Sequence, residues 1–172
     1  CVIGQARLMI EKFKSSHSKL DIDGVFVFSH PYGCSQMGDD GTNTLKSLVN
    51  IIKNPNASGV LILGLGCENT QVDMIKQELG KWDDKRIKFL NIQEVEDEIK
   101  VGVNMIEDIY QYVRYDKRSL QSLSKLRLGL ECGGSDALSG ICANPLIGLL
   151  SDKFIEYGGT CVLTEVPEMF GA

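Results

Sequence analysis

Short apolar runs rich in β-branched residues recur along the chain, and each is followed by glycine or a polar loop. Between these runs lie stretches whose apolar positions repeat with helical spacing, which is the pattern of successive β-α units. The runs predicted as strands are Val25–Ser29, Val60–Gly64, Ile87–Asn91, Leu126–Leu130 and Thr160–Thr164. They are mostly apolar at consecutive positions, as is typical of parallel strands that are covered by helices on both faces.

The intervening stretches predict helices at Gln5–Ser16, Asn43–Lys53, Thr70–Leu79, Glu96–Val113 and Ser135–Tyr157. In the fourth of these, Ile99, Val103 and Ile106 belong to one apolar stripe that can pack on a sheet. Asn144–Pro145 interrupts the last stretch, so we expect a break or two shorter helices there. The pattern as a whole predicts an α/β fold, a three-layer Rossmann-like domain with a mainly parallel five-stranded sheet and helices on both faces.

The length of 172 residues and the hydrophobic fraction of 43% suit one sizeable core, so we expect a single α/β domain over residues 1–172. The chain begins without methionine and ends just after an apolar run, which we interpret as a domain excised from a longer multidomain protein. The net charge of -5 argues against a nucleic-acid partner. Neither a signal peptide nor a membrane-spanning window is visible, which predicts a cytoplasmic protein without a membrane partner.

The chain contains six cysteines, an even number that in a small secreted protein would indicate disulfides. The surrounding pattern is that of an ordinary α/β core, so we expect reduced thiols instead. No complete GxGxxG or phosphate-loop motif follows a predicted strand, and therefore no nucleotide cofactor is predicted.

Three of the cysteines lie shortly after predicted strands: Cys34, Cys67 and Cys132. The carboxyl ends of parallel strands meet at one edge of a sheet, where α/β proteins bind ligands. We therefore expect the three thiols to lie close together, and thiolates are suitable ligands for iron or zinc. For any one cysteine alone, a role as a small apolar filler is the more common explanation.

His30 ends the first predicted strand, and Pro31 after it favours an extended backbone that aims the imidazole ring. The ring can act as a general base or as a metal ligand, with a structural hydrogen-bonded histidine as the alternative. Carboxylates in the same loops can act as acid, base or hard ligand, or can instead cap helices and form ion pairs. These are Glu68, Asp136, Glu165 and Glu168.

Four loops together resemble the altronate dehydratase and galactarate dehydratase family. Their sequences are His30-Pro31-Tyr32-Gly33-Cys34-Ser35-Gln36, Gly64-Leu65-Gly66-Cys67-Glu68-Asn69, Gly129-Leu130-Glu131-Cys132-Gly133-Gly134-Ser135-Asp136 and Thr164-Glu165-Val166-Pro167-Glu168. The resemblance covers nearly the whole chain from about Asp23. Family members are iron-dependent hydro-lyases of sugar acids and are longer than this sequence, so we expect the fragment alone to be inactive.

The resemblance implies a sugar-acid dehydratase that removes water from an aldonic or aldaric acid, such as D-altronate or D-galactarate, to give a 2-keto-3-deoxy sugar acid. It implies His30 as base or metal ligand and Cys34, Cys67 and Cys132 near the metal. Glu68 and Asp136 become candidate acids or supporting groups, and the acidic residues Glu165 and Glu168 complete the polar wall.

The resemblance also implies Fe(II) as the cofactor, with Mn(II) or an iron-sulfur cluster as alternatives, because thiolates favour soft metals while sugar-acid oxygens favour hard ones. The expected partners are a small-molecule sugar acid and a second copy of the enzyme in a homodimer. Two other functions stay open: a noncatalytic domain that forms a subunit interface or holds a structural zinc, and elimination from a sulfonated hydroxy acid.

Overall fold

The computed structural model describes residues 2–169 and 171, apart from the side chain of Glu168. The chain divides into two compact units, Cys1–Lys117 and Arg118–Ala172, which we call unit 1 and unit 2 and describe separately. In the described part of the chain, no helix is long and apolar enough to cross a membrane.

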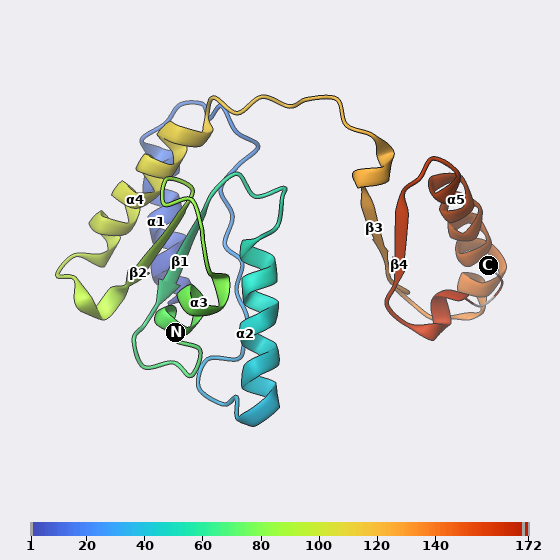
Figure 1. Cartoon of the computed structure of the whole chain (residues 1–172), viewed down its shortest axis with the longest axis horizontal. Helices are drawn as coiled ribbons and strands as arrows, with labels where there is room; N and C mark the ends of the chain where they lie inside the picture. Colours follow the sequence, from blue (N-terminus) through green and yellow to red (C-terminus); the bar gives the residue numbers. More distant parts are fainter. Residues whose placement is uncertain (1, 170, 172) are drawn as a thin grey trace. The chain divides into compact units, whose positions relative to one another are not determined.

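Unit 1 is built around a two-stranded parallel sheet. β1 (Val60–Gly64) pairs with β2 (Ile87–Asn91) so that Gly64 lies opposite Asn91. The connection between the strands contains α3 (Val72–Leu79), in agreement with the crossover that a parallel pair needs. The carboxyl ends of both strands therefore lie at the same edge of the sheet (Figure 1).

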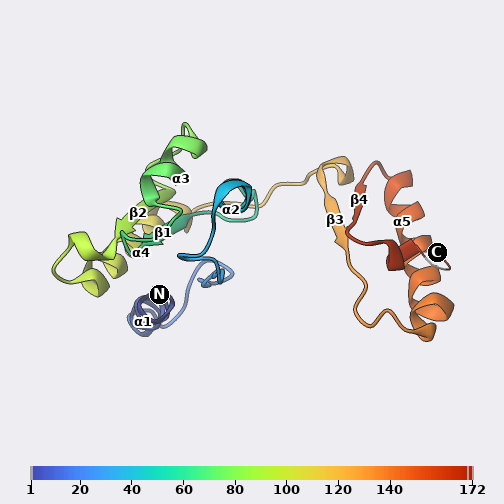
Figure 2. The ribbon, with the colours of Figure 1, turned by 90° about the horizontal axis from the view of Figure 1, so that it is seen from below.

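Helices cover both faces of this sheet. α1 (Ile3–Ser15) and α4 (Glu98–Val113) pack on one face, and α2 (Gly38–Ile52) and α3 pack on the other, so that α1 and α3 lie on opposite sides in Figure 2. The first face buries Met9, Phe13, Leu90, Ile106 and Tyr110, and the second buries Val49, Ile75 and Leu79. Unit 1 thus has three layers and two apolar clusters.

Local sequence explains where two of these helices begin. The Asp97 carboxylate accepts a hydrogen bond from the backbone N–H of Lys100 at 2.8 Å, which caps the first turn of α4. α2 carries Asp39 and Asp40 in its first turn, where negative charge interacts favourably with the helix dipole. These aspartates therefore support the start of the helix.

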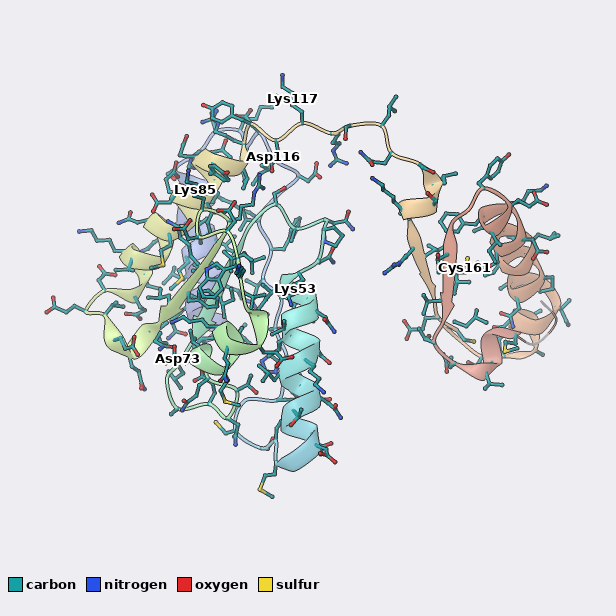
Figure 3. The ribbon with its side chains drawn as sticks, in the orientation of Figure 1. Lys53, Asp73, Lys85, Asp116, Lys117 and Cys161 are labelled. Carbon is teal, nitrogen blue, oxygen red and sulfur yellow. The ribbon has the colours of Figure 1, made fainter. Side chains whose placement is uncertain are left out.

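Unit 2 contains a second parallel pair, β3 (Arg127–Leu130) with β4 (Thr160–Leu163). The remaining elements are the 3-10 turn η2 (Leu123–Lys125), the π-helical turn η3 (Ser139–Ala143), α5 (Asn144–Glu156) and the 3-10 turn η4 (Val166–Met169). Cys161 lies on the side of β4 that faces α5 (Figure 3), where its Sγ is 3.3 Å from the hydroxyl oxygen of Ser151. One helix therefore packs against this sheet.

The expectation of a five-stranded Rossmann-like sheet is wrong. The described residues form two separate two-stranded sheets, β1–β2 and β3–β4. Residues 25–29, expected as the first strand, pair with no described strand, and Figure 1 draws them as coil. A run of β-branched and aromatic residues favours an extended backbone, but a strand also needs a partner, which long-range packing decides. Here Val25 packs against the cluster around Met9, while Phe26 is 80% exposed.

The local predictions are closer to the structure than the sheet prediction. The bounds expected for β1 and β2 are confirmed, and α4 begins two residues later than expected. The expected break near Asn144–Pro145 is also confirmed, because η3 ends at Ala143 and α5 begins at Asn144 with the proline in its first turn. α2 begins at Gly38, five residues before the expected start. Its first turn is polar, so the apolar pattern did not show where the helix begins.

Candidate functional site

The best-defined candidate site lies at the carboxyl ends of β1 and β2. The loop Gly64–Asn69 leaves β1, and the 3-10 turn η1 (Ile92–Glu94) leaves β2. A Cβ on Gly66 would lie 3.3 Å from the side-chain oxygen of Gln93, so the two loops are in contact. Gly66 has φ +111°, a conformation that other residues rarely adopt. The edge predicted to bind ligands is therefore formed by two loops that lie side by side.

Glu68 folds the first loop back on itself. Its Oε2 accepts hydrogen bonds from the backbone N–H groups of Leu65 at 3.1 Å and Gly66 at 2.7 Å. Hydrogen bonds from N–H donors to a carboxylate are among the stronger ones in proteins. One carboxylate oxygen is thus engaged with the backbone of the loop that carries Cys67.

Gly64 allows three neighbouring side chains to approach the end of β1. A Cβ on this glycine would lie 2.5 Å from Oδ1 of Asn91, 2.6 Å from Oε1 of Glu68 and 2.7 Å from Cγ2 of Val72. The Asn91 amide nitrogen donates to Glu94 at 2.8 Å, whereas its buried Oδ1 accepts no hydrogen bond within the described residues. An unsatisfied buried acceptor costs about 1–3 kcal/mol, and such atoms are uncommon in folded proteins.

A second loop joins this edge. The backbone N–H of Asn69 donates to the carbonyl oxygen of Gly33 at 3.1 Å, which places the loop of Cys34 beside the loop of Cys67. Both thiols are free and exposed. The adjacency expected for these two loops is therefore present, although they are more than thirty positions apart in the chain.

His30 lies at the start of the second loop. Its Nδ1 is buried and has no hydrogen-bond partner in residues 2–169 and 171, and its ring centroid is 6.4 Å from that of Tyr32. A structural histidine would normally have a partner for this atom. The geometry therefore favours a ring that is kept available for another group.

The remaining predicted residues lie in unit 2. The Ser135 hydroxyl donates to Sγ of Cys132 at 2.7 Å, and Ser135 has φ +50°, a left-handed backbone that is unusual for serine. The Asp136 carboxylate accepts from the backbone N–H of Ser139 at 2.9 Å and from its hydroxyl at 3.2 Å. These hydrogen bonds, the backbone one first, lower the pKa of Asp136. A lowered pKa favours the capping role over that of a general acid.

The carboxyl edge of unit 2 is closed by Thr164, whose hydroxyl donates to the carbonyl oxygen of Leu130 at 2.9 Å. Glu165 follows it and is exposed. The side chain of Glu168 lies outside the described residues, so its expected role in the polar wall stays a prediction.

The structure thus brings together the loops of Cys34 and Cys67 in unit 1 and places Cys132 in unit 2, so the three-cysteine centre stays a prediction. Imidazole and thiolate are suitable donors for iron. In the described residues, however, no three His, Cys, Asp or Glu side chains are gathered so that they could hold a metal ion.

Sequence reasoning missed Asn91, Gln93 and Glu94. The signal was present, because Ile87–Asn91 was expected as a strand and its carboxyl end must lie at the same edge as that of β1. The loops singled out from the sequence after Ser29, Gly64 and Leu130 contain a cysteine or histidine, and the loop after β2 contains neither.

Comparison with known proteins gives a consistent picture for both units. Residues 1–114 match the family described as D-galactarate dehydratase/Altronate hydrolase, second domain, and residues 123–172 match D-galactarate/Altronate dehydratase, C-terminal. The boundary between the two matches falls near the boundary between unit 1 and unit 2. No solved structure is significantly similar to the chain.

Three curated relatives illustrate the range of similarity. The chain is 52% identical to the altronate dehydratase of Escherichia coli (strain K12) over its whole length, and it spans 35% of that protein. It is 36% identical to the galactarate dehydratase (L-threo-forming) of the same organism, over 73% of the chain and 26% of the relative. It is 30% identical to the (2R)-sulfolactate sulfo-lyase subunit beta of Chromohalobacter salexigens, over 88% of the chain and 39% of the relative.

Proposed function

Because the chain belongs to the D-galactarate dehydratase/altronate hydrolase family, we propose that it is part of a sugar-acid dehydratase. The reaction is loss of water from an aldonic or aldaric acid, such as altronate or galactarate, with a 2-keto-3-deoxy sugar acid as product. The chain spans about a third of the curated altronate dehydratase, so residues beyond it can contribute to catalysis. The protein acts in the cytoplasm, and the full-length enzyme is a homodimer.

The observation that supports this proposal is the hydrogen bond between Asn69 and Gly33, because it joins the loops of Cys34 and Cys67 at the edge where α/β proteins bind ligands. His30, with its unpartnered Nδ1, lies at the start of the first of these loops. The family resemblance and the geometry therefore direct attention to the same edge of unit 1.

The chemistry requires a base and an acid from the protein. A base removes the proton from the carbon next to the carboxylate, an acid protonates the departing hydroxyl as the C–O bond breaks, and the resulting enol then becomes the ketone. We assign the base to His30, which alternatively serves as a metal ligand. Glu68 and Asp136 are candidate acids or supporting groups, and Glu165 and Glu168 contribute polar groups to the wall.

A divalent metal would stabilise the extra negative charge that develops on the substrate carboxylate. We propose Fe(II) for this role, with Mn(II) or an iron-sulfur cluster as alternatives, and with Cys34, Cys67 and Cys132 near it. Anaerobic purification of the full-length protein with iron and acid-labile sulfide assays separates these cases. Active protein without sulfide eliminates the cluster.

A panel of aldonic, aldaric and sulfonated acids tests the reaction itself. We expect the full-length protein to release a keto acid from altronate or galactarate, and His30→Ala to lower kcat by about 10²–10⁴-fold, as is usual for loss of a general base. Turnover of sulfolactate alone would favour elimination from a sulfonated acid, which the similarity to the sulfo-lyase subunit keeps open.

A noncatalytic role as a structural or subunit-interface domain is the second candidate. Exposed leucines along α5, such as Leu146 and Leu149, favour it for unit 2. It predicts that Cys67→Ser harms folding and turnover together. The dehydratase proposal expects a Cys67→Ser protein that melts as the unmodified protein does but has lost turnover, which a melting curve and a keto-acid assay measure in parallel.

A further inference from the structure

The loop that carries Cys67 is held by a side-chain arrangement that the sequence did not reveal. It consists of Glu68, which bonds to the loop backbone, and Asn91, which lies against the same glycine from the neighbouring strand. We propose that Glu68 and Asn91 are positioning residues of the site, and that Glu68 shapes the loop rather than carrying a proton. This inference rests on the proposed function, because the loop is important only if the edge binds a ligand.

The two oxygens of Glu68 have different surroundings. Oε2 accepts both loop N–H groups, from Leu65 and Gly66, so the carboxylate closes the turn immediately after β1. Oε1 lies against Gly64, in the space that a side chain would fill. A carboxylate fixed in this way has a defined position but has little freedom to reach toward a substrate.

Asn91 approaches the same glycine from the neighbouring strand. Its Oδ1 lies within 2.5 Å of the position of a Gly64 Cβ, and its amide nitrogen is held by Glu94 at 2.8 Å. Asn91 is paired with Gly64 in the sheet register, so the strand pairing itself sets this contact. The glycine, the amide and the carboxylate therefore form one packed group at the end of the sheet.

The effect of this group extends to the loops that carry Cys67 and Cys34. Cys67 lies between the Gly66 N–H that Glu68 accepts and the Asn69 N–H that binds the carbonyl of Gly33. Fixing the 65–69 turn therefore fixes the backbone on both sides of Cys67 and aligns it with the Cys34 loop. The two residues act through the loop and are not themselves assigned to contact the substrate.

Hydrogen exchange in the full-length protein tests directly whether Glu68 holds the loop. Glu68→Ala should raise amide exchange in the peptide covering residues 64–69 about tenfold, as expected for loss of a hydrogen bond to a charged group. Glu68→Gln, which keeps an acceptor oxygen, should restore most of the protection. Glu96→Ala, a change at an exposed glutamate beyond β2, is the control and should leave this peptide unchanged.

Variants of Asn91 test the second half of the proposal. Asn91→Ala should raise exchange in the same peptide a few-fold, and Asn91→Asp should raise it further, because the new carboxylate would lie next to both Glu68 and Glu94. Unchanged exchange in both variants would remove Asn91 from the assignment. Melting curves show that each variant is folded.

Turnover distinguishes positioning from proton transfer. If Glu68 positions the loop, Glu68→Gln loses less than about tenfold in kcat and keeps the pH profile, whereas loss of a proton carrier costs about 10²–10⁴-fold. A large loss in Glu68→Gln with normal exchange would overturn the proposal. The exchange measurement does not depend on a substrate. It can therefore show whether Glu68 and Asn91 hold the loop even if the dehydratase assignment fails.

Discussion

The two units of this chain use the same pieces but differ in how much they bury. Unit 1 places helices on both faces of β1–β2 and contains two clusters of buried apolar side chains. In the described part of unit 2, Leu130 is the one buried hydrophobic side chain. Val162 and Leu163 are consecutive in β4, so they point to opposite faces, and both are exposed.

The difference shows that a parallel strand pair with one helix does not make a core. Such sheets are normally covered on both faces, and a two-stranded sheet alone has little apolar area to bury. Unit 1 satisfies that requirement because helices cover both faces of its sheet. In the described part of unit 2, α5 is the single α-helix beside the β3–β4 pair. We therefore expect the free energy of unfolding to depend mainly on unit 1.

Truncating one large side chain in each unit should give the largest difference between the units in the free energy of unfolding. Phe13 is 0% exposed, and Phe13→Ala should lower the free energy of unfolding by about 3–5 kcal/mol through lost burial and a cavity. Leu149 is 66% exposed, and Leu149→Ala should change it by less than about 0.5 kcal/mol. Urea unfolding followed by circular dichroism measures both. Equal losses would mean that unit 2 has a core of its own.

Adding a methyl group to one strand glycine in each unit gives a smaller contrast. Gly64→Ala would force its Cβ against Asn91, Glu68 and Val72, and should cost about 1–3 kcal/mol by overpacking. Gly129→Ala in β3 meets no atom within 4 Å and should be neutral or slightly stabilising. Thermal melting measures the difference. A neutral Gly64→Ala would show that the end of β1 is not closely packed.

The smallest expected effect is a pH dependence in unit 1. Arg86 donates to both oxygens of Asp116, which lies just after α4 (Figure 3), at 2.7 and 2.8 Å, and this pairing lowers the pKa of Asp116 below its usual 3.8. The pair therefore stabilises the fold above that pH and loses its contribution as the pH falls through the lowered value. Because Asp116 is 42% exposed, the contribution is at most about 1 kcal/mol.

Asp116→Asn should make the free energy of unfolding less dependent on pH below about 4, since the ordinary aspartate pKa lies there. Asp73→Asn, a change in an exposed pair with Lys76, is the matched control and should alter little. Urea titrations at several acidic pH values measure the slope. An unchanged slope in Asp116→Asn would show that the ion pair is broken in solution.

Part of the candidate site was accessible from the sequence. The rule that parallel strands end at one edge predicted that the loops of Cys34 and Cys67 would be neighbours. The Asn69–Gly33 hydrogen bond joins these two loops, but residues 25–29 pair with no described strand, so this neighbourhood does not arise from the strand pairing that the rule assumed. The sequence left the role of Glu68 open between catalysis and capping. The presence of a glutamate does not show which N–H groups its carboxylate accepts hydrogen bonds from. Asn91 was missed because its contact with Gly64 depends on strand register, which composition does not display.

The sequence by itself determined β1 and β2, the positions of α1, α3 and α4 to within a few residues, and the motifs that mark the family, because these depend on residues only a few positions apart. The tertiary structure decided which stretches became paired strands, as residues 25–29 show, and which carboxylates were engaged with backbone N–H groups. The physical reason is that strand pairing and burial depend on contacts between residues far apart in the chain. Local preference permits such contacts but does not select among them.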